Sequence, residues 1–156
     1  MSVEPVKYRV RMATEQDEPQ LMLLCEGLAE ENALFAPNFD KVRDVVRNVV
    51  RNRNGFVGCI GSHEKLEGAI MILVSAMWYT DQPCLEELFN YVVPEFRASR
   101  RAVQLVEFAK SVSNKMGLPM LIGIVSNVRT EAKVRLYDRK LSRAGAFYLH
   151  QPEGNA

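Results

Sequence analysis

The sequence predicts one domain of the α/β (α+β) class, in which a central mixed, mostly antiparallel sheet is flanked by about four helices. The first observation is length, since 156 residues suit a single core. The second is composition, since 47% hydrophobic and 25% charged residues are ordinary for a globular protein. The third is periodicity, since apolar residues alternate in some segments and recur at helical spacing in others. We therefore treat residues 1–156 as one domain.

The N-terminal third predicts one strand followed by two helices. Residues 8–12 alternate as a strand does, and Thr14 is a candidate N-cap for the first helix. The apolar face of that helix carries three leucines, Leu21, Leu24 and Leu28. A second helix is expected from about Asp40 to Arg51, where valines form one buried stripe, and Asn54-Gly55 ends it.

The middle of the chain predicts a meander of three strands. Residues 55–61 form a short strand, and a polar turn at 62–65 leads into a longer strand over 66–79. A third strand runs over 85–93 and stops at Pro94, which has no N–H to donate to a central ladder.

The C-terminal half predicts two strand-to-helix units and a closing strand. The clearest helix begins at Arg101, and Gly117 supplies its C-terminal stop. A short strand over 120–125, a helix over 130–141 and a strand over 146–150 follow. Parallel pairing of these units places a crevice at the strand ends, where ligands usually bind.

A basic loop over 94–102 joins the third strand of the meander to the clearest helix. Its arginines stand at the first turn of that helix: Arg97, Arg100 and Arg101. Cations there oppose the helix dipole, whereas the unpaired N–H groups attract anions. The arrangement therefore predicts a phosphate site, to which Ser99 adds a donor. The alternative is a solvated basic turn relieved by Glu95.

The loop sequence RASRRA resembles the GNAT superfamily of acyl-coenzyme A-dependent N-acyltransferases. The family pattern there is Arg or Gln, x, x, Gly, x, Gly or Ala, and Arg100 replaces its central glycine. A second segment, Thr130 to Tyr137, is similar to the family's Asn, x, x, Ala, x, x, Leu, Tyr helix. Leu136 and Tyr137 are in register, while Thr130 and Lys133 depart from the pattern.

The resemblance implies acetyl-coenzyme A as co-substrate and assigns roles to named residues. Cofactor-binding positions are Val92, Val93, Arg97, Ala98, Ser99, Arg100, Arg101, Ala102, Asn127 and Thr130, with Ser126 a further candidate. Tyr137 stands where the family places the phenol that protonates the departing thiolate, although a tyrosine packed in the core is the alternative.

The general base is expected on the strand before the loop. Glu86 and Glu87 are the candidates, and they point to opposite faces because strand side chains alternate. We favour Glu86, which by strict alternation shares a face with Asn90 and Val92. A backbone N–H near Val92 is expected to stabilise the developing oxyanion.

The function expected from the resemblance is N-acetyl transfer to a primary amine by direct attack, without a covalent intermediate. The alternative is a catalytically weak or inactive module that binds coenzyme A, a nucleotide or a protein partner. The acceptor is expected to be a small-molecule or peptide amine, and a homodimer is possible. Aromatic residues that could line the acceptor site are Phe35, Trp78 and Tyr79.

Composition argues against several other classes of protein. A net charge of +1 disfavours a nucleic-acid footprint. Three separated cysteines and two histidines predict neither a disulfide framework nor a metal site. Because no apolar run is long enough to span a bilayer or act as a signal peptide, we expect a cytoplasmic protein without a membrane span.

Overall fold

The computed structural model describes residues 8–32, 34–51, 53–124 and 129–154. The elements in chain order are β1 (Arg11–Met12), η1 (Glu15–Asp17), α1 (Glu18–Asn32), α2 (Phe39–Val50), β2 (Gly55–Gly61), β3 (Leu66–Ala76), β4 (Pro83–Val92), η2 (Pro94–Phe96), α3 (Arg101–Met116), β5 (Met120–Leu121) and α4 (Thr130–Lys140). No helix in the described part of the chain is long and apolar enough to cross a membrane.

The strands form one sheet in the order β1-β2-β3-β4-β5. Neighbouring strands are antiparallel except for β4 and β5, which are parallel, so the predicted mixed, mostly antiparallel sheet is confirmed. The parallel pairing joins only Leu85 to Met120 and Glu86 to Leu121. Beyond Glu86, β4 continues to Val92, and there no described strand lies on the edge of β4 that faces β5.

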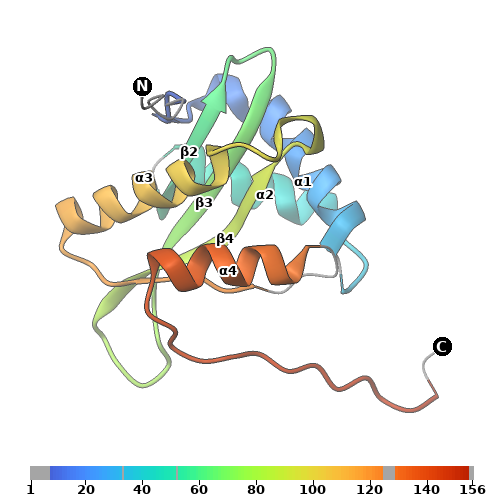
Figure 1. The fold of residues 1–156 in the computed structure, drawn as a ribbon, viewed down its shortest axis with the longest axis vertical. Helices are drawn as coiled ribbons and strands as arrows, with labels where there is room; N and C mark the ends of the chain where they lie inside the picture. The colour runs from blue at the N-terminus through green and yellow to red at the C-terminus, as the bar shows by residue number, and fades with distance from the viewer. Residues whose placement is uncertain (1–7, 33, 52, 125–128, 155–156) are drawn as a thin grey trace, which may run out of the picture.

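Helices cover both faces of the sheet, as Figure 1 shows. The leucines of α1 and the valines of α2 pack on one face, against core residues that include Val57, Met71 and Phe89. The α3 helix packs on the other face, where Leu105 and Ala109 are fully buried. The α4 helix lies beside α3, and Lys140 of α4 pairs with Glu107 of α3 at 3.0 Å. The αL residue Gly117 (φ 66°) ends α3 as predicted.

One surplus residue interrupts the alternation of β4. Along β3, Met71 pairs with Phe89 and the next residue, Ile72, pairs with Glu87. Leu88 therefore has no partner in the register, which is a β-bulge, and its side chain is exposed. Glu87 consequently lies on the same face as Asn90 and Val92, and Glu86 lies on the opposite face.

A buried carboxylate ties the N-terminal segments to the sheet. Asp17 has no solvent-exposed surface, and both its oxygens accept hydrogen bonds from Arg11, at 2.8 Å each. The carboxylate also accepts from the Thr14 N–H at 2.8 Å and lies 2.8 Å from Nδ1 of His63. Arg11 donates in addition to the carbonyl of Gly61. The cluster thereby joins β1 and η1 to the β2–β3 hairpin.

The ends of the sheet differ from the sequence prediction. Within the strands expected over 8–12 and 120–125, the residues that pair with a neighbouring strand are those of β1 and β5. Val125 lies outside the described residues. The strand predicted over 146–150 is wrong, because those residues are extended and exposed and pair with no described strand. An alternating sequence becomes a strand only where a partner strand supplies its hydrogen bonds.

Candidate functional site

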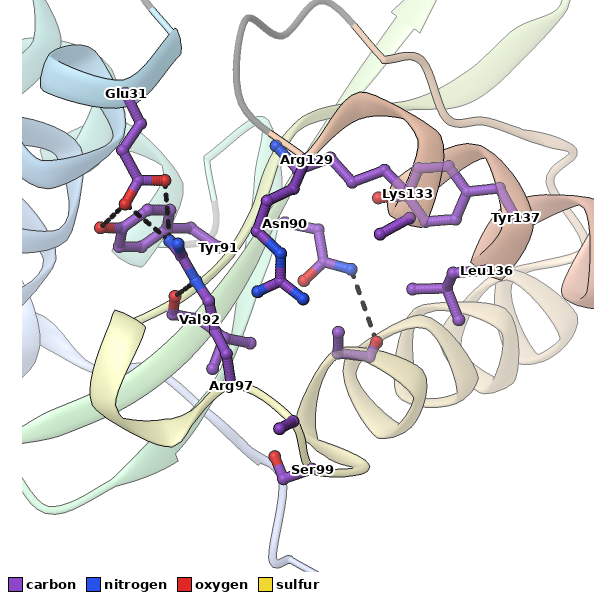
Figure 2. A pocket seen from close by; sticks show the side chains of 13 residues that line it. Glu31, Asn90, Tyr91, Val92, Arg97, Ser99, Arg129, Lys133, Leu136 and Tyr137 are labelled. Atoms are coloured by element: carbon purple, nitrogen blue, oxygen red, sulfur yellow. Dashed lines mark hydrogen bonds and ion pairs between the residues drawn. The ribbon is translucent and has the colours of Figure 1, made fainter.

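A cavity of about 130 Å³ lies where β4 continues past β5. The end of β4, the loop before α3 and the inner face of α4 surround it, as Figure 2 shows. Six residues of the predicted site line this cavity: Val92, Arg97, Ala98, Ser99, Ala102 and Tyr137. Seven further lining residues were not assigned to the site from the sequence: Glu31, Asn90, Tyr91, Arg129, Ala132, Lys133 and Leu136.

Arg97 is held by the protein itself at the wall of the cavity. Its Nη2 lies 2.8 Å from both carboxylate oxygens of Glu31, on α1. Its Nε donates to the carbonyl of Val92 at 2.9 Å, and its guanidinium lies 5.2 Å from the centre of the Tyr91 ring. Figure 2 shows these bonds side by side. Arg97 therefore joins α1 to the edge of β4 and has little charge left for a ligand.

Arg100 and Arg101 point to different surroundings. Arg101 pairs with Glu67 at 3.1 Å and stacks between the rings of Tyr8 and Phe96, outside the cavity lining. Arg100 is exposed at the N-cap of α3 and forms no ion pair with another described residue. Of the three loop arginines, Arg100 is thus the one without an ion pair to a described residue, and it too lies outside the cavity lining.

The backbone of the loop is shaped to begin α3. Ala98 has a φ of 56°, a left-handed conformation that is strained for a residue with a Cβ. Ser99 Oγ donates to the carbonyl of Phe96 at 2.8 Å and accepts from the N–H of Arg101 at 3.3 Å. The bond from the Arg101 N–H satisfies one of the N–H groups that a helix start leaves unpaired.

The end of β4 presents one backbone N–H to the cavity side. Val93 donates its N–H to the carbonyl of Glu67 on β3 at 2.9 Å, and its side chain packs in the core beneath α1. Because N–H directions alternate along a strand, the N–H of Val92 points to the opposite edge, which β5 leaves open. The N–H of Val92 therefore lies on the open edge, while Val93 bonds to the sheet and packs in the core.

Tyr137, Glu87 and Asn90 form a partly buried polar group at the cavity, and Tyr137 and Asn90 line it. Burial raises the pKa of Tyr137 well above its usual range, and the negative charge of Glu87 acts in the same direction. Burial also raises the pKa of Glu87 to about 8, although Lys133 and a hydrogen bond from Tyr137 oppose this shift. Oε2 of Glu87 and Oδ1 of Asn90 are buried and have no hydrogen-bond partner among the described residues.

The assignment of Glu86 to the cavity face is wrong. Its carboxylate is exposed and accepts a hydrogen bond from Ser75 at 3.1 Å, on the opposite face of β4. Strict alternation would have placed it beside Asn90, but the surplus residue Leu88 reverses the faces before the bulge. Glu87 is thus the acid that lies next to Tyr137.

Two cations that the sequence did not assign to the site come from the start of α4. Lys133 and Tyr137 are spaced by four residues and lie on one face of the helix, and Arg129 is its N-cap residue, with a left-handed φ of 59°. Figure 2 shows the guanidinium of Arg129 reaching into the space between Asn90 and Arg97. Arg129 forms no ion pair with another described residue, whereas burial lowers the pKa of Lys133. The four-residue spacing to Tyr137 is the sequence signal that could have found Lys133, whereas no helical spacing applies to Arg129.

Other predicted residues lie elsewhere. Thr130 begins α4 outside the cavity lining, and Asn127, with Ser126, lies outside the described residues. The aromatic residues proposed for the acceptor site are exposed and also outside the lining: Phe35, Trp78 and Tyr79.

Comparison with known proteins gives matches in structure alone. No family model and no curated protein matches the sequence. The structure of a possible acetyltransferase from Clostridium difficile 630 is similar, with a TM-score of 0.71 at 17% identity, over 94% of this chain and 98% of that one.

Two further structures carry ligands. AAC(6')-Iy in complex with the bisubstrate analogue CoA-S-monomethyl-acetylneamine has a TM-score of 0.69 at 12% identity, over 95% of this chain and 99% of that one. An aminoglycoside acetyltransferase from an uncultured soil metagenomic sample, in complex with sisomicin, has a TM-score of 0.64 at 16% identity, over 92% and 96%. The chain therefore has the GNAT acetyltransferase fold.

Proposed function

We propose that this protein transfers an acetyl group from acetyl-coenzyme A to a primary amine. One observation carries the proposal: the cavity at the open edge of β4 brings Tyr137 and Lys133 of α4, the N-cap residue Arg129 and the start of α3 around one space. A helix start attracts phosphate, and a buried phenol with a raised pKa keeps a proton that it can donate. The helix start suits the phosphates of acetyl-coenzyme A, and the phenol suits its thioester end.

The residues present fit such a co-substrate in named places. Arg100, Arg129 and the N–H groups at the start of α3 would hold the phosphates. The N–H of Val92, on the open edge, would donate to an oxygen of the bound molecule. When bound, acetyl-coenzyme A would supply the thioester and the acetyl group.

The roles in proton transfer follow from the partly buried polar group. Tyr137 holds its proton at neutral pH and would give it to a departing thiolate. Glu87, with a pKa of about 8, would accept the amine proton directly or through water. A base is most effective when its pKa lies near the working pH, which favours Glu87 over the exposed Glu86. Direct attack by the amine needs no covalent enzyme intermediate.

The acceptor class proposed is a small-molecule or peptide amine. Similar structures include aminoglycoside acetyltransferases and a ribosomal-protein-alanine N-acetyltransferase from Brucella melitensis, so both kinds of amine occur on this fold. A fold hosts many substrates, and the choice between them therefore rests on a screen of amines.

Titration calorimetry with coenzyme A tests the binding step. The double variant Arg100→Ala, Arg129→Ala should bind about tenfold more weakly or worse, because each change removes a charge-assisted phosphate contact. Arg139→Ala, an exposed arginine of α4 outside the cavity lining, is the matched control and should bind as the wild type does. Failure of the wild type to bind, or unchanged binding by the double variant, would contradict the proposal.

A thiol-release assay with a panel of amines tests the chemical step. Tyr137→Phe should lower kcat roughly 100-fold while leaving coenzyme A affinity nearly unchanged, because it removes only the proton donor. Equal turnover by wild type and variant would remove Tyr137 from the mechanism.

A module that binds without acyl transfer is the second candidate function. Lys133 favours it, because this side chain lines the cavity where the family pattern has alanine. Tight coenzyme A binding without turnover on any amine would support such a module. Competition by ATP with comparable affinity would identify a general nucleotide-binding domain instead.

A further inference from the structure

Among the described lysines, Lys133 is the one that lines the cavity. It is half-buried, and its backbone N–H donates to the carbonyl of Arg129 at 3.2 Å, so the first turn of α4 fixes where the side chain begins. Tyr137 stands four residues further along the same face of the helix and lines the same cavity, as Figure 2 shows. The fold thus places a primary amine and a phenol around one space.

Charges of both signs surround this amine. Burial lowers the pKa of Lys133 from its usual value, and the positive charges of Arg97 and Arg129 act in the same direction. The negative charges of Glu31 on α1 and Glu87 on β4 oppose this shift and do not cancel it. At neutral pH the amine is therefore uncharged more often than a lysine with the usual pKa. An uncharged amine carries the electron pair that a nucleophile needs.

The other groups that acyl transfer to this amine would need lie beside it. Glu87 is near enough to Lys133 to affect its pKa, and Oε2 of Glu87 has no hydrogen-bond partner among the described residues. Tyr137 keeps its proton at neutral pH, because burial raises the pKa of the phenol. A nucleophile, a proton acceptor and a proton donor thus come together without any amine from outside the chain.

We propose that Lys133 is a site of self-acetylation, where Nζ accepts the acetyl group of an acetyl thioester held in the cavity of the same chain. The inference rests on the proposed function for the binding of the thioester, and it adds an acceptor within the protein. Nζ would attack the carbonyl carbon, so that a C–N bond forms and the C–S bond breaks.

The protons balance in this step. The nitrogen gives one proton to Glu87 or to water, and the departing sulfur receives one from Tyr137. Neither an oxidant nor a reductant is needed. The amide that forms carries no charge, so each modified chain loses one cation from the cavity lining.

Peptide mapping by mass spectrometry, after incubation with acetyl-coenzyme A and no amine, tests the modification. Lys133 should be acetylated about tenfold faster or more than the exposed Lys41 and Lys115, which report unspecific chemical acetylation. Dilution of the protein should not change the rate, because donor and acceptor lie in one chain. Equal acetylation of the three lysines, or a rate that falls on dilution, would overturn the inference.

Matched variants identify the groups involved. Lys133→Arg keeps the charge and should abolish the modification at this position, whereas Lys115→Arg, the control on α3, should leave it unchanged. Tyr137→Phe should slow it by about tenfold or more, because the thiolate then leaves without its proton donor. Thermal melting establishes that each variant is folded.

Trace labelling of the protein alone with acetic anhydride separates this inference from the proposed function. The reagent needs no cofactor site, and it reacts only with the uncharged amine. Labelling of Lys133 should reach half of its maximum at a lower pH in the folded protein than in the chain unfolded in urea. Saturating coenzyme A should protect Lys133 and leave Lys115 unprotected. If coenzyme A binds but Lys133 labels alike in both states and gains no acetyl group, the inference alone fails; absence of coenzyme A binding would overturn both.

Discussion

Glu87 is a buried acid whose protonation should govern both activity and stability. Its pKa of about 8 lies above the usual value of 4.5, chiefly because burial disfavours the charged form. The folded state therefore holds a proton that the unfolded state has lost between these two pH values. The free energy of unfolding should fall as the pH rises through this window, and activity should rise as Glu87 ionises.

The variant Glu87→Gln separates these effects. The variant should lose most of the turnover, and the increase of activity with pH near 8 should disappear. At pH 9 it should be more stable than the wild type by on the order of 1–3 kcal/mol, because no buried charge forms. Urea unfolding at pH 6 and pH 9, with pH–rate profiles, measures both. Glu86→Gln, on the exposed face, is the control; an identical response from the two variants would remove the special role of Glu87.

The sequence predicted the side chains of the cavity best where a local pattern determines them. The loop from Arg97 to Ala102 follows from strand-to-helix order, whereas Tyr137 was assigned to the site by its resemblance to the family's helix pattern. The partners of the arginines could not be predicted, because Glu31 and Glu67 come from distant segments of the chain. Charge at a helix start predicted three phosphate ligands, whereas ion pairing within the fold leaves only Arg100 without a described partner.

The packing of α3 on the sheet depends on one position without a side chain. A Cβ at Gly58 of β2 would lie 2.5 Å from Cδ1 of Phe108, whose ring packs edge-on against Phe56. Gly58→Ala should therefore lower the free energy of unfolding by about 1–3 kcal/mol, because the ring of Phe108 must move within a filled core. Urea unfolding measures the loss.

Gly145→Ala is the matched control for this substitution. A Cβ at Gly145 would meet no atom of another described residue within 4 Å, so the control should change stability by less than about 0.5 kcal/mol. Equal stabilities of the two alanine variants would show that α3 does not need the close approach at Gly58.

At the scale of elements, periodicity predicted the long helices and the three-strand meander. The regular spacing of apolar residues determines these elements, because it gives each of them one apolar face that can be buried. The short strands β1 and β5 and the segment over 146–150 depend instead on whether a partner strand lies alongside. Hydrogen bonding between strands is not encoded in the local pattern, and the sequence therefore overestimated the extent of pairing.

The integrity of the whole molecule depends on Asp17, which joins β1 and η1 to the distant β2–β3 hairpin. Burial alone would raise the pKa of this carboxyl, but hydrogen bonds from Arg11, from the Thr14 backbone and from His63 together hold the pKa well below its usual range. Its contribution to stability is therefore complete above the unfolded pKa of 3.8 and is lost as the pH falls towards the lowered value.

Asp17→Asn should destabilise the protein by about 3–5 kcal/mol at pH 7, because it leaves the guanidinium of Arg11 partly buried without its counter-charge. The loss should be smaller at pH 3 than at pH 7, where the wild-type carboxylate contributes fully. Urea unfolding at the two pH values measures this. Asp40→Asn, whose side chain is 95% exposed, should have little effect; a comparable loss there would refute the special place of Asp17.

The surplus residue at Leu88 divides β4 into two stretches whose side chains face in opposite order. Removal of Leu88 would take out the surplus residue and leave Glu87 two positions from Asn90, so Glu87 would still face the cavity. Glu86 would take that place only if β4 kept all its residues and lost the bulge. The presence of the bulge, and not the identity of either residue, thus determines which acid faces the cavity. When relatives of this chain are aligned, a single gap in β4 decides which of their acids corresponds to Glu87.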